Sequence, residues 1–92
     1  MDNRVRETLL ILQEECAEVT QAVSKCFRFG LDNFKPGKSS TNLEHLETEI
    51  GDILAMIDIL VEQGIVSKEN LVVATAAKKQ KLIQWSNIYE NM

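Results

Sequence analysis

Two pairs of carboxylates recur at helical spacing in this chain of 92 residues. Glu15 and Glu18 form the first pair, and Glu49 and Asp52 form the second. Side chains three positions apart lie on one face of an α-helix, so each pair places two negative charges side by side. If two such helices pack with the pairs facing each other, protons or cations must neutralise the charges. Mg²⁺ prefers oxygen ligands and often leaves coordination sites for substrate phosphates, so the pattern predicts a metal-dependent enzyme acting on phosphates.

The first pair belongs to a long amphipathic segment. Apolar residues recur at steps of three and four from Val5 to Cys26, which predicts a helix over residues 3–29 that ends at Gly30. The segment that follows, residues 31–40, contains the only proline and a Pro-Gly pair, so it is expected to be a loop.

The second pair belongs to a segment that opens with a helix-start signal. Thr41 and Glu44 have the spacing of a capping box, and the apolar stripe behind them predicts a helix over about residues 42–63. Gly64 is expected to follow it in the left-handed conformation. Gly51 lies mid-helix at a cost of about 1 kcal/mol relative to Ala, which a helix tolerates where another backbone or a ligand approaches closely.

A third helix is expected after Ser67, extending through about residue 89. The fold class is therefore all-α, a helical hairpin plus a third helix in a single domain covering residues 1–92. A core of this size often needs a partner subunit to bury enough apolar surface. We expect assembly into four-helix-bundle units in a homodimer or homotetramer.

Composition excludes several classes of function. The net charge of −4 argues against nucleic-acid binding, and no apolar run approaches the length of a membrane span. Cys16 and Cys26 would lie about 15 Å apart on one helix, too far for a disulfide, which favours a reducing compartment. The cytoplasm is the expected location, or the host cytoplasm if a bacteriophage encodes the protein. His45 is the only histidine, which excludes a zinc site with several His ligands.

Positive charges gather outside the acidic segments, in two groups: Lys25, Arg28, Lys35 and Lys38, and Lys78, Lys79 and Lys81. Acidic residues that could bind a metal, with basic residues nearby that could bind phosphate, suit a nucleotide site. The alternative interpretation is that both are solvated helix faces, and that the protein is a non-catalytic helical interaction module whose acidic faces dock a basic partner. Saturable thermal stabilisation by Mg²⁺ or Mn²⁺ would distinguish the enzyme from the module.

The acidic residues also carry a resemblance to a known family. Glu14, Glu15 and Glu18, followed by Glu49 and Asp52, resemble the motifs of the MazG-type nucleoside triphosphate pyrophosphohydrolases, more specifically the compact MazG-like proteins of bacteriophages. The resemblance extends weakly through residues 81–85. The spacer of thirty residues between the two motifs is slightly long for the family.

The resemblance implies Mg²⁺-dependent hydrolysis of nucleoside triphosphates, with deoxynucleotides as the expected substrates, to a nucleoside monophosphate and pyrophosphate. Mn²⁺ is expected to substitute for Mg²⁺. The implied metal ligands are Glu15, Glu18, Glu49 and Asp52. The resemblance implies that the metal activates the attacking water and that Glu14 and Glu15 are the catalytic residues, with Glu14 as an outer ligand or in positioning water.

Substrate contacts are expected from basic and aromatic residues: Lys25, Arg28, Lys78 and Lys81 toward the phosphates, and Trp85 as a further substrate-binding residue. The Lys residues of the third helix could act within their own subunit or on a neighbouring one. One of Phe29, Phe34 and Trp85 could stack on the nucleobase; the alternative is that these aromatics belong to the core or to a subunit interface.

Overall fold

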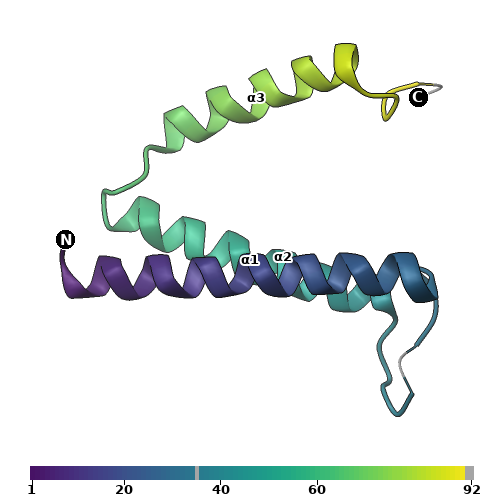
Figure 1. Ribbon diagram of the computed structural model, residues 1–92. Helices are drawn as coiled ribbons and strands as arrows, with labels where there is room; N and C mark the ends of the chain where they lie inside the picture. The colour runs from purple at the N-terminus through teal and green to yellow at the C-terminus, as the bar shows by residue number, and fades with distance from the viewer. Residues whose placement is uncertain (35, 91–92) are drawn as a thin grey trace.

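Three helices make up the fold (Figure 1). The computed structural model describes residues 1–34 and 36–90. Within them the helices are α1 (Asn3–Phe29), α2 (Asn42–Glu62) and α3 (Lys68–Trp85), and no strand is formed. The expected all-α fold, a helical hairpin plus a third helix, is confirmed.

The hairpin of α1 and α2 is the packed part of the molecule. The two helices lie against each other and run in opposite directions (Figure 1). Val5, Ala22 and Leu60 are buried along the contact, which provides the small apolar core. Near one end of the hairpin, Gln63 Nε2 at the end of α2 donates a hydrogen bond of 3.0 Å to Thr8 Oγ1 on α1.

The starts and stops of the hairpin helices follow the local signals. Gly30 ends α1 with a φ of +87°, a left-handed conformation that glycine adopts without strain. The capping box is present, because Glu44 N–H donates to Thr41 Oγ1 at 3.1 Å and Thr41 N–H donates to Glu44 Oε1 at 2.9 Å. Gly64 follows α2 with a φ of +71°, as expected of its position.

The expected end of the third helix is wrong. α3 stops at Trp85 instead of continuing to about residue 89, because Ser86 adopts an extended conformation with φ −146° and ψ 173°. Its hydroxyl donates to the carbonyl of Leu82 at 2.7 Å and so stabilises the helix end. Serine side chains compete in this way with the backbone for hydrogen bonds, which favours helix termini over helix interiors.

The third helix diverges from the hairpin after the turn at Gly64 (Figure 1). The radius of gyration is 16.2 Å, against about 12 Å for a compact chain of this length. Large apolar side chains consequently remain exposed on α2 and α3, among them Leu54, Val72, Val73 and Ile83. Within the described residues, no helix combines the length and apolar content that crossing a membrane requires.

Candidate functional site

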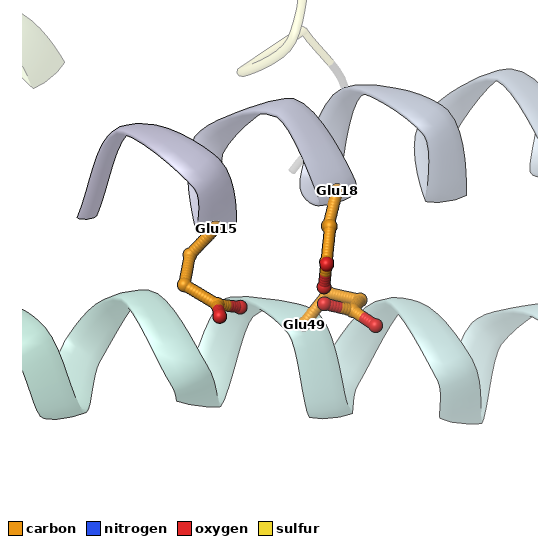
Figure 2. Close-up of side chains that lie close together, drawn as sticks. All are labelled: Glu15, Glu18 and Glu49. Atoms are coloured by element: carbon orange, nitrogen blue, oxygen red, sulfur yellow. The ribbon is translucent and has the colours of Figure 1, made fainter. Parts of the chain in front are cut away.

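The carboxylates predicted on the two hairpin helices face each other. Glu15 and Glu18 extend from α1 toward α2, where Glu49 meets them (Figure 2). One oxygen from each of these three residues lies within 4.8 Å of the others. Asp52 is not among these three converging residues, but it lies close enough for its negative charge to contribute to raising the pKa of Glu15. The hairpin therefore brings together three of the four paired residues, with Asp52 nearby.

The register of the hairpin is fixed on both sides of this cluster. At one end Gln63 is bonded to Thr8, and at the other Asn42 Nδ2 donates to the carbonyl of Gly30 at 2.9 Å. Because both helices are continuous between these two ties, neither can slide along the other without breaking a hydrogen bond between partly buried groups. The carboxylates are thus held opposite each other by contacts outside the cluster itself.

The cluster contains buried oxygens without partners. Glu49 is only 8% exposed, and Oε2 of Glu15 and Oε2 of Glu49 are buried with no hydrogen-bond donor among the described residues. Within residues 1–34 and 36–90 the only ion pair is between His45 Nε2 and Glu49 Oε1, at 3.7 Å. Buried acidic groups are normally paired or bound to a metal. The arrangement of acceptor oxygens without lysine or arginine partners therefore fits a hard divalent cation.

The electrostatics of the cluster favour protons where no cation is bound. Burial raises the pKa of Glu15 above its ordinary value, and the negative charges of Glu18, Asp52 and Glu49 raise it further. A hydrogen bond with Glu18, burial and the charges of Glu18 and Asp52 raise the pKa of Glu49, while His45 opposes the shift. Each shift has the direction expected of carboxylates crowded together in a partly buried site.

These pKa shifts give the site a defined pH dependence. Just above pH 4.5, the ordinary pKa of a glutamate, the folded protein still holds protons on Glu15 and Glu49 that the unfolded chain has released. Because the folded state binds more protons there, the metal-free fold becomes less stable as the pH rises from 4.5 through the raised pKa values. Cations must displace the same protons, so Mg²⁺ affinity is expected to rise over that interval. Thermal melts from about pH 4 to about pH 8 should show a growing stabilisation by Mg²⁺. A stabilisation that stays constant with pH would contradict this.

The other residues predicted on α1 lie outside the cluster. Glu14 is exposed beside it, and Lys25 is half-buried, seven positions beyond Glu18 or about 10 Å along the helix axis. Arg28 lies near the end of α1 with its guanidinium 4.8 Å from the centre of the Phe29 ring. Their roles toward substrate stay predictions.

The residues predicted on α3 are separated from the cluster within one chain. Lys78, Lys81 and Trp85 are exposed on α3, which diverges from the hairpin (Figure 1). Gly51 faces open space, since an added Cβ would meet nothing within 4 Å among the described residues. No backbone of the described chain approaches Gly51, so the expected close approach stays a prediction for a ligand or a second subunit. Lys35 lies outside the described residues.

Two asparagines have structural roles that the sequence pattern does not indicate. Asn42 is 3% exposed at the start of α2, and Asn33 bonds to the carbonyl of Phe29 at the end of α1. Both help to close the loop between the helices. Polar residues flanking a loop are too common for their spacing alone to have revealed this.

The chain matches a known protein family over most of its length. The family model described as the MazG nucleotide pyrophosphohydrolase domain matches residues 4–84, a segment that includes Glu15, Glu18, Glu49 and Asp52. Neither the curated proteins nor the solved structures give a significant match. The bacteriophage type of the family stays a prediction.

Proposed function

The chain belongs to the MazG nucleotide pyrophosphohydrolase domain family, and from this premise we propose that it hydrolyses nucleoside triphosphates, with deoxynucleotides as the favoured substrates. The products are a nucleoside monophosphate and pyrophosphate. The observation that carries the proposal is the convergence of Glu15, Glu18 and Glu49, with buried oxygens that lack hydrogen-bond donors among the described residues. A site of this kind suits metal-dependent phosphate chemistry better than it suits a packed interface.

Four carboxylates are proposed to hold Mg²⁺, for which Mn²⁺ would substitute: Glu15, Glu18, Glu49 and Asp52. When bound, the ion polarises the phosphoryl oxygens, lowers the pKa of an attacking water and offsets charge on the departing pyrophosphate. His45 approaches Oε1 of Glu49, while Oε2 has no donor among the described residues. This contact orients the carboxylate, as outer partners of metal ligands commonly do.

The proposed reaction forms a bond between a water oxygen and the α-phosphorus and breaks the anhydride bond between the α- and β-phosphates. Glu15 faces the reacting group from α1, and exposed Glu14 beside it serves as an outer ligand or positions the water. Lys25 is the predicted base closest to the carboxylates along α1, so it is the first candidate for contacting the phosphates.

An oligomer would complete the site. The single chain leaves Lys78, Lys81 and Trp85 exposed on α3, away from its own carboxylates. It also exposes several large apolar residues on α2 and α3, which a second copy would cover by forming four-helix-bundle units. In such a homodimer or homotetramer, α3 of one subunit supplies its basic residues and Trp85 to the carboxylates of a neighbour. We propose residues 1–92 as the single domain of each subunit.

The proposal is tested by incubating the protein with Mg²⁺ and each common ribo- and deoxynucleoside triphosphate, and identifying the products. Release of pyrophosphate and monophosphate, with faster turnover of deoxynucleotides, is the expected result. Release of orthophosphate would contradict the cleavage site. Absence of turnover with every nucleotide, in a protein that Mg²⁺ still stabilises, would favour the helical interaction module instead.

A further inference from the structure

A cavity lies at the loop end of the hairpin, beyond the carboxylates. It has a volume of about 620 Å³, within the range typical of small-molecule sites. Its described lining combines one arginine with aromatic and uncharged residues, and comprises Arg28, Phe29, Asn33, Phe34, Pro36 and Asn42. No carboxylate lines it among the residues that the structure describes, so this lining is unsuited to a cation and differs chemically from the metal cluster.

The wall formed by the end of α1 depends on one glycine and one amide. Gly30 turns the chain sharply with a φ of +87°, and a Cβ there would lie 3.4 Å from Asn33 Nδ2. The same Nδ2 donates to the carbonyl of Phe29. The turn therefore fixes the amide of Asn33 at the cavity while leaving the Phe29 ring on its surface.

The opposite wall depends on the start of α2. Asn42 is tied twice, because its Nδ2 donates to the carbonyl of Gly30 at 2.9 Å and its N–H donates to the carbonyl of Asn33 at 2.9 Å. Beside it, Phe34 and Thr41 form an isolated antiparallel bridge. These bonds set the two sides of the loop against each other and give the cavity a defined shape.

The chemistry of this cavity suits a flat heteroaromatic ring. Phe29 and Phe34 keep 47% and 58% of their surfaces exposed, and the Arg28 guanidinium lies over the Phe29 ring. Aromatic rings and guanidinium groups stack on the faces of nucleobases, whichever base it is. An asparagine amide carries both donor and acceptor groups, which match the polar edge of a base.

Polar residues lie between this cavity and the carboxylates. Asn42 also lines a smaller cavity of about 200 Å³, together with Lys38, Ser40, Thr41 and His45. His45 in turn lies 3.7 Å from Glu49. Asn42 precedes Glu49 by seven positions on α2, about 10 Å along the axis. An elongated nucleotide can therefore lie along the first turns of α2.

We propose that the larger cavity binds the nucleobase of the substrate, that the smaller one accepts the sugar, that Phe34 stacks on the base and that Asn33 determines base specificity. The inference rests on the proposed function, because it places the base of the same nucleotide whose phosphates meet the carboxylates. In this arrangement the loop between α1 and α2 recognises the base, and the carboxylates of the two helices act on the phosphates.

The test compares steady-state kinetics of loop variants on a panel of nucleoside triphosphates. Phe34→Ala should raise KM for the favoured nucleotide by about tenfold or more through loss of stacking, with kcat little changed. Phe34→Tyr keeps an aromatic ring and should restore the wild-type KM. Asn33→Asp replaces a donor and acceptor with acceptors alone, so it should change the relative kcat/KM of the bases. Phe27→Ala removes an exposed ring from α1 outside this cavity and is the matched control.

The outcomes separate this inference from the function on which it rests. Stabilisation of each variant by Mg²⁺ without nucleotide should equal that of the wild type, which shows that the fold and the carboxylate cluster are intact. A wild type that releases pyrophosphate, with Phe34→Ala and Asn33→Asp indistinguishable from it on every base, overturns the base cavity and leaves the function standing. A wild type that turns over no nucleotide refutes the function and the base cavity together.

Discussion

Replacing Glu15 with glutamine should lower turnover about a thousandfold and, in the same protein, raise the melting temperature measured without metal. The two effects have one cause. Burial and the neighbouring carboxylates raise the pKa of Glu15 above 4.5, so at neutral pH its ionised form destabilises the metal-free fold. Glutamine removes that charge and with it a ligand. Activity assays and thermal melts with and without Mg²⁺ measure both effects.

Glu47→Gln is the matched control, because Glu47 is an exposed glutamate on the same hairpin and outside the cluster. It should keep wild-type turnover and wild-type stabilisation by Mg²⁺. The interpretation of the cluster would be wrong if Glu15→Gln were destabilised without metal, or if it retained the full stabilisation by Mg²⁺.

Replacing Val72 with aspartate should convert the oligomer to monomers and lower the stability of the subunit. Val72 is 62% exposed on α3 in the single chain, a position that the proposed assembly would bury. Losing a buried valine and desolvating a carboxylate there should together cost about 3 kcal/mol or more per subunit. Sedimentation equilibrium would measure the mass, and melts at several protein concentrations would measure the coupling of folding to assembly.

Gln80→Asp introduces the same charge at an exposed polar position of α3 and should leave both mass and melting temperature close to wild type. A wild-type protein that sediments as a monomer would contradict the proposed assembly. So would a Val72→Asp variant whose mass and stability equal those of the wild type.

The hairpin was predictable because its determinants are local. The apolar stripe from Val5 to Cys26 and the capping box at Thr41 specify helix bounds without reference to the rest of the chain. The convergence of Glu15 and Glu49 followed from spacing together with one assumption, that the two helices pack antiparallel. The apolar periodicity determines which face of each helix is buried. The acidic pairs border these faces, so antiparallel packing of the two helices brings the pairs close to each other.

Other features depend on contacts that periodicity does not encode. The end of α3 is set by the hydroxyl of Ser86, which bonds to Leu82 and competes with continued helix. The direction of α3 depends on the turn at Gly64, after which α3 diverges from the hairpin. The cavity at Asn33 and Asn42 arises from bonds between residues separated by a loop, and the identities of single polar residues in a loop do not predict its closure.

The two hydrogen bonds that hold the register of the hairpin allow the loop to change without moving the carboxylates. Thr8 with Gln63 and Gly30 with Asn42 hold the register of α1 and α2, so the residues between Gly30 and Asn42 lie outside the region that aligns the acids. A lengthened spacer is then accommodated as a larger loop, at a small entropic cost, without rotating a carboxylate out of place. If the loop binds the nucleobase as proposed, insertions and substitutions there change which substrate is selected and leave the carboxylates in place.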